Sequence, residues 1–134
     1  MEPRAKSSVL LIYTGGTIGM KPDPETGVMA PFDFSTIYDE FPYLGKLDVE
    51  LEVINLTPID SSNVTPELWC ELARLIRDNY DAYDGFVLTH GTDTMAYTAA
   101  ALSYLIQNNA KPVVITGSQK SIFNQDTDAR ENLR

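Results

Sequence analysis

The sequence predicts an α/β fold in which a parallel β-sheet carries helices on both faces. Two observations support this prediction. Short β-branched apolar segments alternate along the chain with stretches of helical periodicity. Each apolar segment is bounded by glycine or proline and leads into a polar turn, as buried strands do. Because parallel strands need crossover connections, this order predicts one sheet with helices packed on it.

Four segments have the composition of strands. In the second, Val49, Leu51 and Val53 alternate with glutamates, so that apolar side chains recur at the period of a strand. The predicted strands are Val9–Tyr13, Val49–Leu56, Phe86–Thr89 and Pro112–Thr116.

Helical patterns lie between these strands. Thr65, Pro66 and Glu67 supply an N-cap, a proline at the first helical position and an acid in the first turn. This helix is expected to end near Asn79. The other predicted helices are an alanine-rich one over Asp93–Ile106 and a weaker one over Ser35–Phe41, halted by Pro42.

The last eight residues, Thr127–Arg134, have the pattern of a capped helix of two turns. A helix of that length buries little surface and is marginal by itself. One interpretation is a frayed terminal helix, and the other is that the sequence is part of a longer protein. We expect the second.

The composition bounds the class of protein. The 134 residues include 19 Asp and Glu against 10 Lys and Arg, so the formal net charge is −9. This length suits one domain, and the acidic balance argues against nucleic acid as a partner. One cysteine and one histidine exclude an internal disulfide and a zinc cluster. The apolar run Val9–Tyr13 is too short for a membrane span or a signal peptide, so we expect a cytoplasmic protein with no membrane contact.

Polar residues follow every predicted strand. Ligands of parallel sheets bind beyond the carboxyl ends of the strands, so the segments that follow the strands indicate where a site lies. These segments are Thr14-Gly15-Gly16-Thr17-Ile18-Gly19, Thr57-Pro58-Ile59-Asp60-Ser61-Ser62-Asn63, His90-Gly91-Thr92-Asp93-Thr94 and Gly117-Ser118-Gln119.

Such a set of residues suits a small substrate that carries both an ammonium and a carboxylate. Asp60 or Asp93 can hold the ammonium, while Ser61, Ser62 and backbone N–H groups can hold the carboxylate. Thr17, on a Gly-Gly turn, is accessible for attack on a carbonyl, with nearby N–H groups as an oxyanion hole. Amide or ester hydrolysis through an acyl-threonine is therefore a candidate reaction.

Each motif also has a purely structural interpretation. The glycine turn at residues 15–19 has neither the dinucleotide-binding nor the P-loop spacing, and alone it is a tight turn between strand and helix. The sequence contains no G-x-S-x-G nucleophile motif. We expect His90 to brace its turn by hydrogen bonding rather than to act as a base. Asp60 and Asp93 are also placed to cap the helices that follow them.

At these same residues the chain resembles the bacterial L-asparaginases, in particular the cytoplasmic type I group. The two threonine motifs together are highly specific, and the resemblance covers nearly the whole chain. It implies a Rossmann- or flavodoxin-like three-layer fold, with residues 1–134 as the N-terminal domain of a two-domain hydrolase. The segments that carry it are Tyr13-Thr14-Gly15-Gly16-Thr17-Ile18-Gly19-Met20, Ile59-Asp60-Ser61-Ser62, Tyr83–Tyr97 around His90-Gly91-Thr92-Asp93-Thr94, and Lys111–Gln119.

The resemblance implies hydrolysis of L-asparagine to L-aspartate and ammonia, without a metal or organic cofactor. Thr17 is then the nucleophile that attacks the side-chain amide. Thr92 and Asp93 form a second catalytic group, in which Asp93 also binds the α-amino group of the substrate.

The resemblance also implies how the rest of the substrate is held. Asp60, Ser61 and Ser62 bind its amino-acid end, and Ser118 lines the site less directly. Members of the family work as homodimers or homotetramers with sites near subunit contacts.

The chain departs from the family pattern in two places that bear on catalysis. The lysine that completes the second catalytic group lies beyond residue 134 in the family, and neither Lys111 nor Lys120 takes its place. The segment 20–34 lacks the tyrosine that helps to activate the first threonine, and Tyr38 and Tyr43 are the next tyrosines along the chain. We therefore expect the N-terminal part of an asparaginase, lacking its C-terminal domain, with an exposed apolar sheet face and little activity by itself.

Three alternatives remain at this point. An amidotransferase subunit that feeds ammonia to a partner enzyme is disfavoured, because such proteins carry an additional N-terminal domain. A non-catalytic α/β module that binds a small ligand or a flavin is the second alternative. The third is a catalytically incomplete fragment that only associates with intact subunits.

Overall fold

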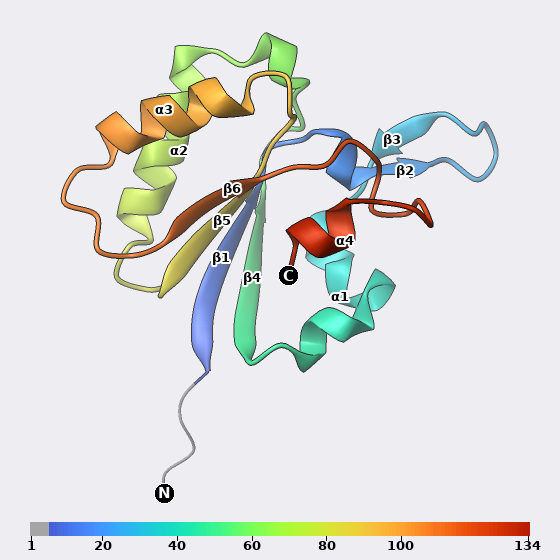
Figure 1. Cartoon of the computed structure of the whole chain (residues 1–134), viewed down its shortest axis with the longest axis horizontal. Helices are drawn as coiled ribbons and strands as arrows, with labels where there is room; N and C mark the ends of the chain where they lie inside the picture. Colours follow the sequence, from blue (N-terminus) through green and yellow to red (C-terminus); the bar gives the residue numbers. More distant parts are fainter. Residues whose placement is uncertain (1–5) are drawn as a thin grey trace, which may run out of the picture.

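The computed structural model describes residues 6–134, whose main sheet has four parallel strands in the order β4-β1-β5-β6 (Figure 1). All four predicted strands are present, and their ends lie within two residues of those expected. The strands are β1 at Ser7–Tyr13, β4 at Val49–Asn55, β5 at Gly85–Thr89 and β6 at Val113–Thr116.

Helices α2 (Pro66–Asp78) and α3 (Met95–Leu105) lie side by side on one face of this sheet (Figure 1). Pro66 occupies the first turn of α2 as predicted, although the side chain of Thr65 makes no capping hydrogen bond. Helix α3 begins two residues after the expected Asp93. The Thr94 hydroxyl donates to the Ser61 carbonyl at 2.7 Å, which holds the preceding residues in a turn.

The opposite face carries shorter helices, so the prediction of helices on both faces is confirmed. They are α1 (Ile37–Glu40) and α4 (Ala129–Asn132), which lie on the other side of the sheet from α2 and α3 in Figure 1. The helix expected over Ser35–Phe41 is divided into a 3₁₀ turn at Phe34–Thr36 and α1. The cause is local, because the Asp33 carboxylate accepts the Ser35 N–H at 3.0 Å and so caps the 3₁₀ turn.

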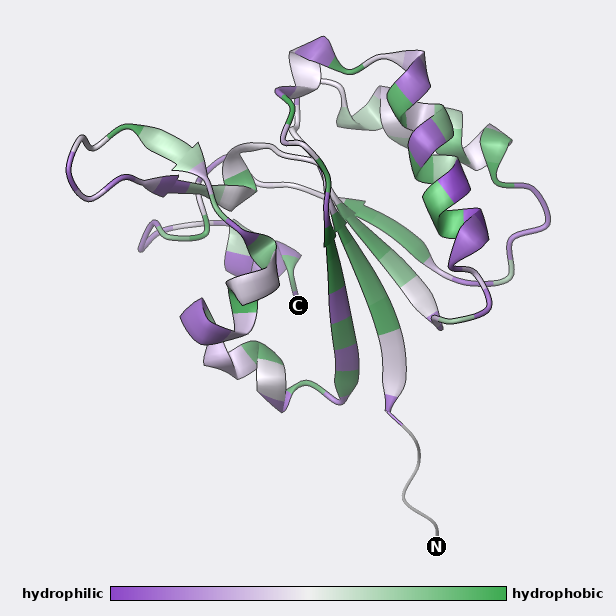
Figure 2. Cartoon of the chain, turned by 180° about the vertical axis from the view of Figure 1, so that it is seen from behind, coloured by the Kyte–Doolittle hydropathy of each residue, from purple (hydrophilic) through white to green (hydrophobic). Residues whose placement is uncertain are grey.

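Alternation along the strands sends their side chains into two separate cores. Leu10 and Ile12 of β1 point toward α2 and α3, where they meet Leu72 and Leu102. Leu11 and Tyr13 point the other way, into a core that is rich in aromatic rings. The same alternation appears as hydrophobic and hydrophilic stripes along β4 in Figure 2. The aromatic core consists of Leu11, Tyr13, Ile18, Phe32, Phe34, Ile37, Phe41, Leu44, Ile122 and Ala129.

A β-hairpin follows the first glycine turn, in a segment where no strands were predicted. Its strands are β2 (Met20–Pro22) and β3 (Met29–Pro31), and it projects from the body of the molecule in Figure 1. Three-residue strands that each end in proline give no periodic signal. The turn between Asp23 and Val28 could have indicated the hairpin, because it contains Gly27, which takes a φ of 69° there.

Part of the aromatic-core face of the sheet stays uncovered, as expected from the sequence. A groove of about 280 Å³ runs along it, and Val114 at its edge is 51% exposed. Its floor is formed by Val9, Leu51, Val87 and Val114. Among the helices of residues 6–134, none has the length and apolar character that crossing a bilayer requires.

Replacing Leu88 with alanine should lower the free energy of unfolding by about 2–5 kcal/mol, because this side chain is fully buried between β1 and the α2–α3 layer. Urea unfolding followed by circular dichroism measures the change. Leu47→Ala is the matched control, since Leu47 is 39% exposed and its truncation should remove about 1 kcal/mol or less. Equal losses for the two variants would contradict the assigned core.

Candidate active site

The strand order places a crevice between β1 and β5. From β1 the chain passes to β4 on one side, while β5 connects through α3 to β6 on the other side. Loops that leave neighbouring strands in opposite directions open a crevice at the carboxyl ends, and this is where ligands of such sheets bind. A cleft of about 210 Å³ occupies this position. Its walls are Tyr13, Gly16, Thr17, Met20, Pro31, Pro58, Ile59, Asp60, Ser61, Gly91, Thr92 and Asp93.

Two glycines allow the loops to approach closely enough to form this cleft. Gly16 has a φ of 90°, and a Cβ on it would lie 2.7 Å from the Gly91 nitrogen. A Cβ on Gly91 would in turn lie 2.7 Å from the Ser61 side chain. The turn after β1 therefore packs backbone against backbone on the turn after β5, which in turn packs against the Ser61 side chain, and only glycine fits at the two contacts.

Thr17 is exposed at the start of a 3₁₀ turn that runs to Gly19. The turn is anchored by Ile18, which is buried in the aromatic core and whose carbonyl accepts the Ile122 N–H at 3.2 Å. Thr17 directly precedes Ile18, so this anchor also fixes the backbone of Thr17, whose side chain lines the cleft. An accessible hydroxyl on a rigid turn is the geometry that a nucleophile needs.

Asp60 lies across the cleft as a fixed carboxylate. Its Oδ1 accepts the backbone N–H of Ser62 at 2.9 Å and the Ser62 hydroxyl at 2.8 Å. These two hydrogen bonds hold the pKa of Asp60 below its ordinary value, the backbone bond contributing most. Among residues 6–134 no donor bonds to Oδ2, so this oxygen of a cleft-lining carboxylate is available to accept a hydrogen bond from a ligand.

Thr92 and Asp93 complete the cleft from the turn after β5. The Thr92 hydroxyl accepts a hydrogen bond of 3.3 Å from the Gln119 side-chain amide. Gln119 is itself held from behind, because the two carboxylate oxygens of Asp128 accept the backbone N–H groups of Gln119 and Lys120 at 3.0 and 3.1 Å. The turn after β6 therefore reaches the cleft through Gln119, a residue for which the sequence indicated no role.

His90 braces the same turn, as predicted. The ring is buried, with Nδ1 2.6 Å from the Gly91 carbonyl and Nε2 2.8 Å from the Thr98 hydroxyl. A carbonyl can only accept, so Nδ1 carries the proton and Nε2 accepts from Thr98. The Thr98 oxygen accepts in turn from the Trp69 indole at 2.8 Å. Each polar group in this chain of hydrogen bonds therefore has a partner. His90 thus has a structural role, because it links α2 and α3 to the turn that borders the cleft.

The structure brings together most, but not all, of the site residues predicted from the sequence. Thr17, Asp60, Ser61, Thr92 and Asp93 share the cleft. The hydroxyl of Ser62 is turned to Asp60, and the buried hydroxyl of Ser118 donates to the Lys120 carbonyl at 2.5 Å, so neither lines the cleft wall.

No lysine lies beside Thr92 and Asp93 among residues 6–134. The ammonium of Lys111 donates to the backbone carbonyls of Tyr80 and Tyr83, at the opposite end of the sheet. Lys120 is paired with Asp126.

The tyrosine that borders the cleft is Tyr13, at the end of β1. Tyr38 lines the open groove on the sheet, and Tyr43 packs against Phe41, so neither replaces the tyrosine of the family loop. Burial raises the pKa of Tyr13 to about 12, so at neutral pH its hydroxyl is a hydrogen-bond donor and not a base. In the sequence, Tyr13 was indicated as a strand residue and as the first residue of a segment that resembles the asparaginases, but not as a residue of the site.

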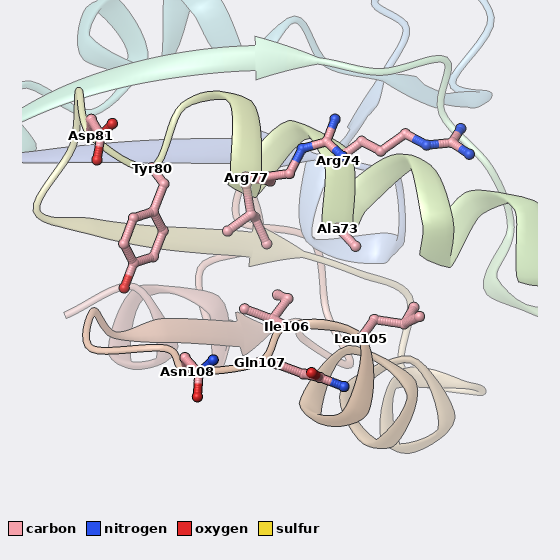
Figure 3. Close-up of a pocket in the computed structure, with 10 residues that line it drawn as sticks. Ala73, Arg74, Arg77, Tyr80, Asp81, Leu105, Ile106, Gln107 and Asn108 are labelled. Carbon is pink, nitrogen blue, oxygen red and sulfur yellow. The ribbon is translucent and has the colours of Figure 1, made fainter.

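A larger hollow of about 460 Å³ lies between α2 and α3 and is shown in Figure 3. It is formed where both helices end, next to the starts of β5 and β6. Those ends of the strands are opposite to the crevice, so we place the site at the smaller cleft, where the loops after β1, β4 and β5 meet.

Replacing Thr98 with valine should lower the free energy of unfolding by about 1–3 kcal/mol, because the buried His90 nitrogen loses its donor and the Trp69 indole its acceptor. Urea unfolding measures the change. Thr65→Val is the control and should be near neutral, since the Thr65 side chain makes no capping bond. A Thr98→Val variant as stable as the wild type would contradict the relay.

Replacing Ser62 with alanine should raise the pKa of Asp60 part of the way toward its ordinary value of about 3.9, because one of the two bonds to the carboxylate is lost. A ¹³C NMR titration measures this pKa, with Asn63→Ala as the control. The stability that these bonds contribute is present above the ordinary pKa and is lost as the pH falls through the lowered one. An unchanged pKa would show that the side-chain bond does not hold the carboxylate.

Comparison with known proteins places this chain in a family. Residues 8–134 match the family described as Asparaginase, N-terminal. L-asparaginase 1 of Escherichia coli K12 is 41% identical over 130 residues, which are 96% of this chain and 38% of that protein.

Solved structures give the same result. L-asparaginase I from Vibrio cholerae is 39% identical with a TM-score of 0.85, covering 96% of this chain and 39% of that one. A probable cytoplasmic L-asparaginase from Campylobacter jejuni is 31% identical with a TM-score of 0.78, covering 96% and 38%. The chain thus spans less than two-fifths of the length of these relatives. By the match over nearly its entire length, it belongs to the asparaginase family.

Proposed function

We propose that the cleft hydrolyses L-asparagine to L-aspartate and ammonia through an acyl-threonine formed on Thr17. The observation that carries the proposal is the meeting of Thr17, Asp60, Thr92 and Asp93 around one small polar cleft, from three separate loops. The relatives named L-asparaginase support the choice of substrate.

The ammonium and the carboxylate of the amino acid bind to neighbouring residues of the turn after β4. The anionic Asp60 attracts the α-ammonium through Oδ2, while Ser62 holds Oδ1. Asp93 adds a second carboxylate for the same ammonium. The buried Ser61 presents its backbone and hydroxyl to the α-carboxylate. Ser118, buried behind Gln119, acts on the site only through the turn after β6.

Catalysis begins with the Thr17 oxygen, which forms a bond to the amide carbon of the substrate. The carbon–nitrogen bond then breaks, and the nitrogen leaves as ammonia with the proton of the hydroxyl. Water attacks the resulting ester, releases aspartate and returns the proton to Thr17. Backbone N–H groups of the glycine turn stabilise the oxyanion, and the reaction needs neither a metal nor an organic cofactor.

Thr92 lies where it can hydrogen-bond the attacked amide, because Gln119 occupies one lone pair of its oxygen and leaves the hydroxyl proton free to turn into the cleft. Asp93 neighbours it in the sequence and in the cleft. We assign the cytoplasm as location, in line with the relative described as a probable cytoplasmic L-asparaginase. We also propose a homodimer or homotetramer as assembly.

A second candidate function follows from the engaged lysines. Lys111 and Lys120 are both held elsewhere, and no lysine is among the described residues that line the cleft with Thr92 and Asp93. The cleft then binds the amino acid without turning it over, as the non-catalytic alternative or a catalytically incomplete fragment does.

The decisive experiment is ammonia release from L-asparagine, measured together with thermal stabilisation by L-aspartate. Thr17→Ala should lower release by at least about 1,000-fold without abolishing binding, because it removes the nucleophile alone. Thr17→Ser should retain part of the activity. Thr65→Ala is the matched control and should release ammonia at the wild-type rate.

Each outcome separates the candidates. Release that survives in Thr17→Ala contradicts the acyl-threonine. Stabilisation by aspartate without release from the wild-type chain favours the binding function. If the wild-type chain neither binds aspartate nor releases ammonia, both candidate functions are contradicted.

A further inference from the structure

The loop that follows β6 contacts both turns that carry the threonines of the cleft. This loop, residues 119–123 and here called the β6 loop, runs from the sheet to the base of the hairpin (Figure 1). At its start, the Gln119 side chain donates to the Thr92 hydroxyl, and two residues later the loop reaches the backbone of Met20. Met20 directly follows the 3₁₀ turn that Thr17 opens. One short segment thus spans the distance between the two threonines.

Ser121 makes the contact between the β6 loop and the hairpin. Its side chain is buried, at 2% exposure, and the hydroxyl donates to the Met20 carbonyl. The same oxygen accepts the Phe123 N–H at 3.2 Å, so it uses a lone pair for Phe123 and its proton for Met20. Met20 lies opposite Pro31 of β3, and proline has no N–H to offer that carbonyl. The Ser121 hydroxyl therefore supplies a donor that Pro31 cannot supply.

The backbone of residues 16–20 is held by a hydrogen bond at every carbonyl. Three of these carbonyls accept N–H groups from within the turn or from the residue after β3. The Ile18 carbonyl accepts the Ile122 N–H of the β6 loop at 3.2 Å. The Met20 carbonyl accepts the Ser121 hydroxyl. The turn that carries the proposed nucleophile is therefore held to the β6 loop at two points.

The start of the β6 loop is fixed to the turn after β5. Gly117, two residues before the loop, lies against the His90 backbone, where a Cβ would be 2.4 Å from the His90 carbonyl oxygen. The carboxylate of Asp128 accepts the backbone N–H groups of Gln119 and Lys120 from behind. The loop therefore has a defined position relative to the turn after β5, and the bonds at its end extend that position to the hairpin.

We propose that Ser121 is a positioning residue, which holds Thr17 at its working distance from Thr92 through the Met20 carbonyl. The inference rests on the proposed function, because it concerns the geometry of that reaction. Ser121 is not among the residues that line the cleft, so it acts through the backbone and not on the substrate. The rate of attack on a carbonyl falls steeply when the nucleophile moves, and a displacement of about 1 Å can cost about 100-fold.

Substrate binding should depend little on Ser121. Two of the residues proposed to hold the amino acid, Asp60 and Ser61, lie on the turn after β4. Among residues 6–134, that turn shares no hydrogen bond with the β6 loop. Loss of the Ser121 hydroxyl should therefore lower kcat and leave KM nearly unchanged, which distinguishes positioning from binding.

Ammonia release from L-asparagine by three variants tests the proposal. Ser121→Ala should lower kcat by at least about 10-fold and change KM by no more than about 2-fold. Ser121→Thr keeps the hydroxyl and should keep most of the rate. Ser103→Ala is the matched control, because the Ser103 hydroxyl also donates to a backbone carbonyl, that of Ala100 at 2.6 Å, and lies outside the cleft. It should release ammonia at the wild-type rate.

Amide hydrogen exchange, followed by NMR, tests the same contact without the reaction. In Ser121→Ala the amides of Met20 and Ile122 should exchange at least about 5-fold faster, because the Met20 carbonyl has lost its donor and the turn separates more often from the β6 loop. The amides of β1 and β5 should exchange as in the wild type, which establishes that the variant is folded.

Three results would overturn the proposal. They are a Ser121→Ala variant with the wild-type kcat, a loss of rate that Ser121→Thr shares in full, and a rise in KM at unchanged kcat. A wild-type chain that releases no ammonia contradicts the proposed reaction, and the exchange measurement then decides the role of Ser121. Unchanged exchange at Met20 and Ile122 overturns it, and faster exchange at these two amides supports it.

Discussion

The contact between Gly16 and Gly91 is the constraint on which the site depends. Two turns that leave neighbouring strands in opposite directions meet there at backbone distance, and the second turn rests on Ser61. Any side chain at either glycine would separate the loops, and Thr17 would then move relative to Asp60 and Thr92. The chemistry of the cleft is therefore set by the absence of side chains at two positions as much as by the hydroxyls and carboxylates around it.

The sequence was informative where one local pattern decided the structure. Short β-branched apolar segments located β1, β5 and β6, and alternation located β4. The rule that parallel sheets bind ligands at their carboxyl ends located the cleft. The hairpin at residues 20–31 was not predicted, because its strands are too short to show a period. The roles of Tyr13 and Gln119 were not predicted for a different reason. They depend on contacts between segments that are far apart in the chain, and a local sequence pattern does not reveal such contacts.

Polar groups of the site are held by satisfied hydrogen bonds before any ligand arrives. Asp60 is fixed through Ser62, Gln119 through Asp128, and His90 through Thr98. Such a site loses little reorganisation energy on binding, because its donors and acceptors already point where they are needed. The core between the sheet and helices α2 and α3 also helps to hold these polar groups in place, because Trp69 lies on α2 and Thr98 on α3.

The relay through His90 has an optical consequence. Trp69 is the only tryptophan of the sequence, and its indole N–H is joined through Thr98 and His90 to the turn that carries Thr92. Indole emission depends on the hydrogen bond of that nitrogen and on the polarity around the ring. The tryptophan fluorescence of this chain thus comes from one residue that is hydrogen-bonded, through Thr98 and His90, to one wall of the cleft. A movement of that wall should change the tryptophan emission, so no added label is needed to detect it.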